Sequence, residues 1–209
     1  MEIFDEVLVN AIDQYTLHQK KLNEIRINAF PDGSIVIRNQ GTGIPIKKQE
    51  NIWIPELIFG HLLTSSNFDD EEQRTTGGRN GYGAKLANVF SKLFKVDISD
   101  GKKTYSQTWR DNMSVCEPPV IDSIKQDPFV RIEFWPDYER FGGRHDELKV
   151  FTKRAFDTAL WCPKANVYFN DFKLTVESFE EYAKMFVGEV PIAKAGDVLV
   201  AHSLSLIHI

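Results

Sequence analysis

The chain has 209 residues and a formal net charge of −5, with 42% hydrophobic and 26% charged residues. That length holds one sizeable α+β domain, or one domain and the start of another, and the composition is ordinary for a soluble globular protein. The acidic balance argues against broad electrostatic adhesion to nucleic acid by this region alone. Cys116 and Cys162 form no C-x-x-C pair, and no apolar run is long enough to span a membrane. Zinc-ribbon, thiol-redox and membrane-spanning classes are therefore excluded, and we expect an intracellular protein without membrane association.

An amphipathic helix is predicted at the start of the chain, because apolar residues recur every three or four positions from Ile3 to Tyr15. The opposite face carries Glu6, Asn10 and Asp13, which fall within about 60° of one another at 100° per residue. Three polar side chains therefore point the same way. On its own, such a face is an ordinary solvated helix surface.

A β-hairpin is predicted next, with strands over 24–30 and 34–38 joined by the turn Pro31-Asp32-Gly33. The second strand runs into NQGTGIP, residues 39–45, where Gly41 and Gly43 free the backbone from the limits of a Cβ. We expect another group to approach the main chain closely there. A G-x-G after a strand is also compatible with a simple turn.

The remaining elements alternate between helix and strand. A short helix is expected from Pro55 to about Leu63, and a second helix from Ala84 to about Phe94. Antiparallel strands are expected over 95–99, 103–110 and 129–135, with Asp100-Gly101 as the turn between the first two. A helix over 146–160, a strand pair at 167–169 and 173–176, and a helix from Phe179 complete the prediction.

A glycine-rich stretch, TSSNFDDEEQRTTGGRNGYGAK, covers residues 64–85 and has no apolar periodicity. Glycines at 77, 78, 81 and 83 allow several backbone N–H groups to point into one concavity, which is the geometry that binds phosphate. The helix expected after it adds unpaired N–H groups and a positive dipole end. Phosphate binding is therefore the favoured interpretation, with a mobile surface loop as the alternative.

Two well-known phosphate loops do not fit this stretch. In a Walker loop the lysine would follow the second glycine directly, but Ala84 displaces it to Lys85 and Leu86 takes the hydroxyl position. A dinucleotide fingerprint starting at Gly81 and Gly83 would need a glycine where Leu86 stands, and it would need a preceding strand. The loop must belong to another class of nucleotide site.

The three clusters, in this order along the chain, resemble the N-box, G1 and G2 motifs of the GHKL ATPases: gyrase, the ninety-kilodalton heat-shock chaperone, histidine kinases and MutL. Within that superfamily, FDEVLVNAIDQ, NQGTGIP, the glycine-rich stretch and TYSQTWRDNM resemble the ATPase domain of eukaryotic-type DNA topoisomerase II, including viral members. The resemblance covers about Phe4 to Met185. A bacterial gyrase is expected to carry an aspartate where Asn39 stands. The fold implied is α+β, a two-layer sandwich with helices on one face of a mostly antiparallel sheet.

The resemblance implies a role for each motif residue, with ATP and Mg²⁺ as cofactors. Glu6 is the base that orients and deprotonates the attacking water, and Asn10 supplies an amide oxygen to Mg²⁺. Asp13 and Gln14 line the nucleotide pocket, although an asparagine is usual at the second of these positions. The adenine amino group is bound by a residue of the strand-end loop, whose glycines give the base and ribose room. These residues are Asn39, Gly41 and Gly43.

The glycine-rich stretch supplies two further sets of contacts by the same resemblance. Ribose and phosphate contacts fall to Ser65, Ser66 and Asn67. The lid that surrounds the β- and γ-phosphates consists of Gly78, Arg79, Asn80, Gly81, Tyr82, Gly83, Ala84 and Lys85.

The function implied is that of the ATP-hydrolysing N-gate of a type II topoisomerase. ATP would drive homodimerisation and couple hydrolysis to the passage of one DNA duplex through a double-strand break in another, with DNA engaged by the full-length enzyme. The implied location is nuclear or cytoplasmic, or a viral factory. The alternative is a nucleotide-switched clamp of the chaperone or MutL type, a binding module whose client is protein or mismatched DNA. The lid sequence favours the topoisomerase.

Three divisions of the chain are expected. Residues 1–186 form the ATPase domain, truncated at its start because Met1 opens directly into a helix without a capping residue. Residues 187–203 begin the family's transducer domain, and 204–209 look like a translated sequencing adaptor. The transducer lysine that the family delivers to the γ-phosphate would then lie beyond the chain, so we expect these residues alone to bind ATP and Mg²⁺ but to hydrolyse ATP weakly.

Overall fold

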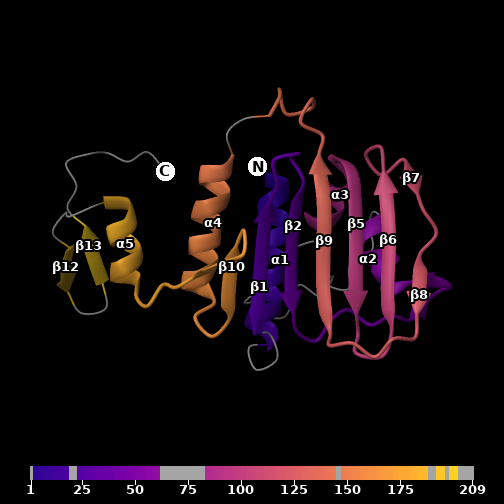
Figure 1. The fold of residues 1–209 in the computed structure, drawn as a ribbon, viewed down its shortest axis with the longest axis horizontal. Helices are drawn as coiled ribbons and strands as arrows, with labels where there is room; N and C mark the ends of the chain where they lie inside the picture. The colour runs from indigo at the N-terminus through magenta and orange to yellow at the C-terminus, as the bar shows by residue number, and fades with distance from the viewer. Residues whose placement is uncertain are drawn as a thin grey trace, which may run out of the picture.

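The computed structural model describes residues 2–18, 23–61, 83–144, 147–187, 192–195 and 198–201. The helices are α1 (Glu2–His18), α2 (Ile54–Gly60), α3 (Gly83–Val89), α4 (Leu148–Trp161) and α5 (Phe179–Val187). Within these residues one large sheet forms a layer, and α1, α2 and α3 lie behind it in the view of Figure 1, while α5 lies to the left of the sheet. The architecture is the α+β sandwich predicted from the sequence.

The large sheet has the strand order β11-β10-β1-β2-β9-β5-β6-β7, with β8 also paired to β6. Its strands are β1 (Glu24–Ala29), β2 (Ile35–Gln40), β5 (Ser91–Ser99), β6 (Thr104–Arg110), β7 (Val115–Cys116), β8 (Val120–Asp122), β9 (Phe129–Pro136), β10 (Asn166–Phe169) and β11 (Phe172–Leu174). Among these strands β1 and β10 pair in parallel and the other neighbours pair antiparallel. Two small hairpins stand apart: β3 (Lys48–Gln49) with β4 (Ile52–Trp53), and β12 (Ile192–Ala195) with β13 (Val198–Ala201).

The hydrophobic core lies between the helices and one face of the sheet. Strand β9 shows why, because Val130, Ile132 and Phe134 alternate with partly exposed residues and are buried together with Phe4 of α1. The Phe94 and Phe134 rings lie 6.3 Å apart across neighbouring strands. Burying an aromatic or branched side chain contributes roughly 1.5–3 kcal/mol, so this face provides most of the fold's cohesion. It also fixes α1 against β2, which positions the candidate site.

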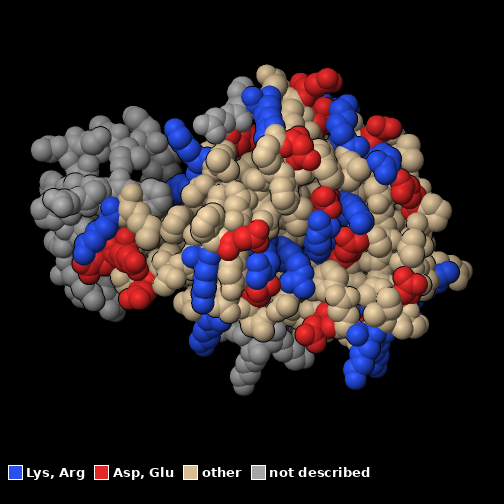
Figure 2. Space-filling view, viewed as in Figure 1, with Lys and Arg blue, Asp and Glu red and all other residues tan. Residues whose placement is uncertain are grey.

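The opposite face of the sheet is open and carries charged side chains, which Figure 2 shows in alternation. Arg26, Arg38 and Arg131 stand in register on the adjacent strands β1, β2 and β9. Like charges directly opposite one another are unfavourable unless they are neutralised. Glu24 binds both Arg26 at 2.8 Å and Arg38 at 3.2 Å, and Asp97 binds Arg131 at 2.9 Å. The row is therefore internally compensated, which suits a solvated sheet face.

The helix after the glycine-rich stretch is shorter than the sequence predicted. We expected it to reach about Phe94, but α3 ends at Val89 and Phe94 lies within β5. The reason is a change of period, because Phe94, Val96 and Ile98 are buried at alternate positions as in a strand. The Ser91 hydroxyl also donates to the Ala87 carbonyl at 2.6 Å, which satisfies an orphan carbonyl at the helix end.

The helix that begins near Pro55 also ends early, at Gly60 rather than near Leu63. His61 is already extended, and residues 62 and 63 lie outside the described part of the chain. Gly60 faces the indole of Trp109, and a Cβ there would lie 2.8 Å from its Nε1. The predicted hairpin at Pro31–Gly33 is confirmed, and so is the predicted pair of strands after α4, which are joined by Asn170 and Asp171, both with positive φ.

Asp137, the residue after β9, makes the free energy of unfolding depend on pH in the acid range. Its side chain is 3% exposed and contacts Lys92 at 3.3 Å and Arg140 at 3.4 Å. Burial alone would raise the pKa of this carboxyl, but hydrogen bonds from Asn112 and Lys92 and the Lys92 charge outweigh it, so the pKa is lowered. A lowered pKa means stabilisation that is present above the unfolded value of about 3.9 and is lost as the pH falls through the folded value.

We predict that Asp137→Asn lowers the free energy of unfolding at pH 7 by about 2 kcal/mol, because a charge-assisted buried contact is lost. Its further loss of stability between pH 5 and pH 3 should be smaller than that of the wild type. Urea unfolding at both pH values measures this, with Asp122→Asn on exposed β8 as the control. Equal acid sensitivity in wild type and Asp137→Asn would contradict the assignment.

Candidate functional site

The polar side of α1 presents the first cluster. Glu6 is exposed, and Asn10, Asp13 and Gln14 are partly buried, while Phe4 and other apolar residues face the core. The Asn10 amide nitrogen donates to the Glu6 carbonyl at 2.8 Å, one helical turn back. This bond occupies the nitrogen and orients the side chain, so the amide oxygen is the atom left to meet a ligand.

The start of α3 lies directly against this cluster. A Cβ placed on Gly83 would overlap with Oε2 of Glu6, so the backbone of Gly83 passes next to the carboxylate. A side chain at position 83 would have to displace Glu6. Helices α1 and α3 pack on each other. The fold therefore brings the first cluster and the end of the glycine-rich stretch into one place.

Lys85 lies two residues further along α3, and its side chain is only 1% exposed. Burial lowers the pKa of its ammonium group, since removal from water disfavours the charged form. A desolvated lysine gains more from an anionic partner than an exposed one does, because screening by water is weaker. Its neighbour Ala84 is also buried, as the close packing of α3 requires.

Asn39 is the second-last residue of β2 and is 7% exposed. It shares the helix-covered face with Ile35 and Ile37, because residues two apart on a strand point the same way. Its backbone is paired on both sides, to Ile25 and to Val130. The amide therefore points from a rigid central strand toward the side of the sheet that carries α1.

Both glycines after β2 make a backbone contact, and the contact at Gly43 leaves no space for a side chain. Gly41 donates its N–H to the Pro128 carbonyl at 3.2 Å. Gly43 has φ +68°, and a Cβ there would collide with the carbonyl oxygen of Ser99 at the end of β5. The sequence predicted that some group approaches the main chain here, and at Gly43 that group is the Ser99 carbonyl of β5.

Ten of the predicted site residues lie in the described part of the chain. They are Glu6, Asn10, Asp13, Gln14, Asn39, Gly41, Gly43, Gly83, Ala84 and Lys85. The others lie outside the described residues: Ser65, Ser66, Asn67, Gly78, Arg79, Asn80, Gly81 and Tyr82. In the described ranges no group of three or more His, Cys, Asp or Glu side chains could hold a metal ion, so any ion here would need amide, phosphate or water oxygens as well. None of the helices described is both long and apolar enough to cross a bilayer.

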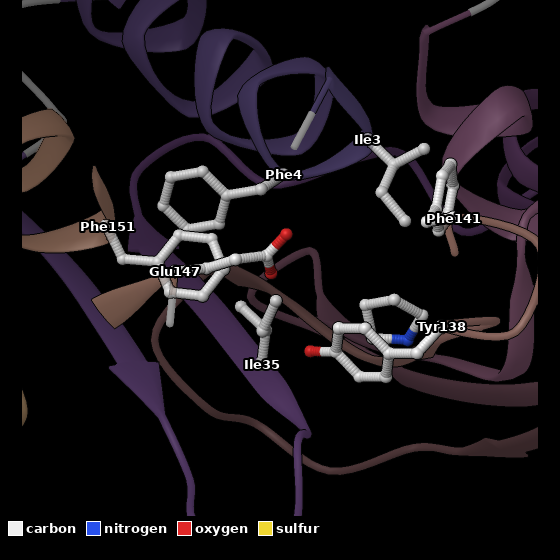
Figure 3. Close-up of a pocket in the computed structure, with 8 residues that line it drawn as sticks. Ile3, Phe4, Ile35, Tyr138, Phe141, Glu147 and Phe151 are labelled. Carbon is white, nitrogen blue, oxygen red and sulfur yellow. The ribbon is translucent and has the colours of Figure 1, made fainter. Parts of the chain in front are cut away.

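A separate pocket opens near the first turn of α1 and the start of α4. Ile3, Phe4 and Phe151 line it together with Ile35, and Figure 3 shows the Glu147 carboxylate reaching between these apolar groups. Ile35 begins β2, whereas Asn39 lies near its end. The pocket is therefore at the other end of β2 from the candidate site.

Sequence reasoning missed two residues that support the site, Ser99 and Asp100. The dipeptide Asp100-Gly101 indicated a turn and nothing more. In the structure the Asp100 carboxylate accepts the N–H of Ile46, which ends the segment containing both glycines. No local pattern joins these positions, so only the folded structure shows the contact.

Comparison with known families agrees with this arrangement. Residues 1–134 match the family described as histidine kinase-, DNA gyrase B-, and HSP90-like ATPase. The chain belongs to this family of ATPases.

Within the family, the chain is similar to type II topoisomerases. It is 44% identical over 195 residues to DNA topoisomerase 2 of Candida glabrata, which covers 89% of this chain and 14% of that protein. DNA topoisomerase 2-beta of Gallus gallus is 42% identical over 194 residues, covering 89% of this chain and 12% of the relative. The chain thus spans about one seventh to one eighth of the length of these relatives.

Solved structures show the same likeness. The ATPase region of Saccharomyces cerevisiae topoisomerase II superposes with a TM-score of 0.84 at 40% identity, covering 93% of this chain and 55% of that chain. The ATPase and transducer domains of DNA topoisomerase II from Balamuthia mandrillaris give 0.84 at 38% identity, covering 94% and 53%. The predicted resemblance and the predicted fold class are confirmed.

Proposed function

We propose that the chain is the ATP-binding and ATP-hydrolysing N-gate region of a type II DNA topoisomerase. The observation that carries the proposal is the contact between Gly83 of α3 and the Glu6 carboxylate of α1. It joins the two motifs that must act on the same phosphate, on the side of the sheet to which Asn39 points. The similarity to topoisomerase ATPase regions supports the same assignment.

Hydrolysis of a γ-phosphate needs a positioned water, neutralised charge and exclusion of bulk solvent. In the proposal Glu6 orients the water and takes its proton, and the nearby backbone of α3 limits where that water can sit. The buried Lys85 meets the β- and γ-phosphates, where a desolvated cation is most effective. Each of these groups belongs to a packed helix rather than to a free chain.

Asn10 fits a magnesium ion. Its nitrogen is bonded to the Glu6 carbonyl, so the amide oxygen is available, and Mg²⁺ prefers such hard oxygen ligands beside phosphate oxygens and water. The ion would neutralise phosphate charge during transfer. Asp13 and Gln14, on the same helix, line the pocket in this proposal.

Asn39 binds the adenine amino group in the proposal, and the segment of Gly41 and Gly43 lies beside base and ribose, with the Cβ position of Gly43 taken up by the Ser99 carbonyl. The support is that the Asn39 amide is buried on the helix-covered face and that both glycines are held by backbone contacts. The ribose and phosphate roles of Ser65–Asn67 and of the lid residues 78–82 remain predictions from the sequence, since they lie outside the described residues.

We expect Asn10→Ala to remove most of the magnesium dependence of nucleotide binding. Calorimetric titration with a non-hydrolysable ATP analogue should show wild-type affinity falling at least about 10-fold when Mg²⁺ is chelated, because the ion links Asn10 to the phosphates. The variant should bind weakly with and without the ion. Thr16→Ala is a matched control, since Thr16 bonds to its own helix at Ile12 as Asn10 does at Glu6. Full magnesium dependence in Asn10→Ala would refute the ligand role.

The activity of the whole protein is tested on DNA. We expect the full-length protein to dimerise with ATP, to pass one duplex through another and so to unlink interlocked DNA circles. The clamp of the chaperone or MutL type would bind and hydrolyse ATP without changing DNA linkage. An absence of ATP-dependent unlinking by active, nucleotide-binding protein would favour that alternative.

A further inference from the structure

The segment that follows Asn39 is supported from behind by the turn between β5 and β6. One carboxylate makes the central contacts. Oδ2 of Asp100 accepts the N–H of Ile46 at 3.2 Å, and Oδ1 accepts the N–H groups of Lys102 at 2.9 Å and Lys103 at 2.8 Å. The side chain thus ties its own turn to a position 54 residues earlier in the chain.

The same turn limits the segment at a second point. The Ser99 carbonyl faces Gly43 so closely that no Cβ fits there, and Ser99 itself is fully buried. Its hydroxyl donates to the Gln126 carbonyl at 3.0 Å and accepts the Gly101 N–H at 3.2 Å. The Ser99 backbone therefore cannot move away from Gly43 without breaking these hydrogen bonds to Gln126 and Gly101.

The two ends of the segment are held as well. Gly41 donates to the Pro128 carbonyl at 3.2 Å, and the Ile46 side chain is 3% exposed in the core. At the second of these ends the backbone N–H of Ile46 depends on Asp100 for its hydrogen bond. A buried N–H group left without an acceptor costs about 1–3 kcal/mol, so the position of this carboxylate constrains the segment.

The carboxylate form is required for all three contacts. Burial opposes ionisation of Asp100, but the N–H groups of Lys102, Lys103 and Ile46 stabilise the anion, and its pKa is lowered. An amide of the same shape could keep the two contacts within the turn through its single oxygen. It would then turn its NH₂ group toward the Ile46 N–H, donor against donor.

We propose that Asp100 is a positioning residue for adenine recognition. It acts through the main chain, because its carboxylate fixes the position of Ile46 while the Ser99 carbonyl fixes that of Gly43. Together these contacts set the shape of the segment from Gln40 to Ile46, which forms the wall next to Asn39. This rests on the proposed function, since it takes Asn39 as the adenine ligand. It adds a residue outside the three motifs, on a turn between two strands, that determines selectivity for the base.

The test uses Asp100→Asn and compares ligands with and without a base. We expect the affinity for a non-hydrolysable ATP analogue with Mg²⁺ to fall about 10-fold, and the preference for it over the GTP analogue to fall similarly. Affinity for magnesium tripolyphosphate, which lacks base and ribose, should stay within about two-fold of the wild type. Asp32→Asn is the matched control, because Asp32 also accepts a backbone N–H in a turn, at the other end of β2.

A second variant, Asp100→Ser, guards against poor folding of the first. Its hydroxyl can accept N–H groups within the turn but is too short to reach Ile46, so the same ligand pattern is expected. Unchanged ATP affinity in both variants would overturn the proposal, as would an equal loss for ATP and tripolyphosphate. If the wild type itself binds no ATP, the proposed function fails instead, and the two failures are distinguishable.

Discussion

Glu6→Gln in the full-length protein should lower ATP turnover by at least about 100-fold while nucleotide affinity stays close to that of the wild type. Glutamine has nearly the same size, so the contact with the Gly83 backbone can be kept. It cannot accept a proton from water, so only the chemical step suffers. Turnover is measured under saturating ATP and Mg²⁺, and affinity by titration with a non-hydrolysable analogue.

Glu2→Gln provides the control for Glu6→Gln, since Glu2 lies on the same helix and is exposed in the first turn. It should turn over ATP like the wild type. If Glu6→Gln also retains turnover within about two-fold, Glu6 is not the base and the site must use another group.

The second large effect is expected from Gly43→Ala. An alanine pays about 1–2 kcal/mol for the left-handed conformation at φ +68°, and its Cβ meets the Ser99 carbonyl, which is backbone of a buried strand. We expect a loss of at least about 2 kcal/mol in the free energy of unfolding and at least about 10-fold in ATP affinity, because the wall next to Asn39 is pushed aside. Urea unfolding and nucleotide titration measure the two effects.

Gly142→Ala separates the conformational cost from the collision. Gly142 has φ +80° with nothing within 4 Å of an added Cβ. It should lose about 1 kcal/mol and bind ATP like the wild type. Equal effects of the two substitutions on ATP affinity would show that the contact with Ser99 does not shape the site.

Elements with a strong period could be predicted from the sequence. The stripe from Ile3 to Tyr15 predicted α1, and the turn Pro31–Gly33 predicted the hairpin of β1 and β2. The end of α3 could not be predicted in the same way, because Leu93 and Phe94 continue a helical spacing and also fit the alternation of β5. Tertiary packing on the sheet decided between the two.

The candidate site shows the same division between local and long-range information. Glycine positions and polar residues on one helix face indicated which residues to examine. Their meeting could not be read from spacing, because the contacts of Gly83 with Glu6 and of Ile46 with Asp100 join distant parts of the chain. Two-residue strands such as β3 and β7 were missed because so short a segment has no measurable period.

The proposed site as a whole is tested by titrating this chain with a non-hydrolysable ATP analogue and Mg²⁺. Binding is measured by calorimetry, and the stabilisation of the fold is measured by thermal unfolding. We expect one nucleotide per chain, a preference for adenine over guanine, and a rise in Tm of about 5 °C at a ligand concentration near 100 times Kd. A separate sample of the chain, given ATP in place of the analogue, should hydrolyse it weakly. No binding and no rise in Tm, with protein shown to be folded, would contradict the assignment of Glu6, Asn10, Asn39 and Lys85 to one ATP site.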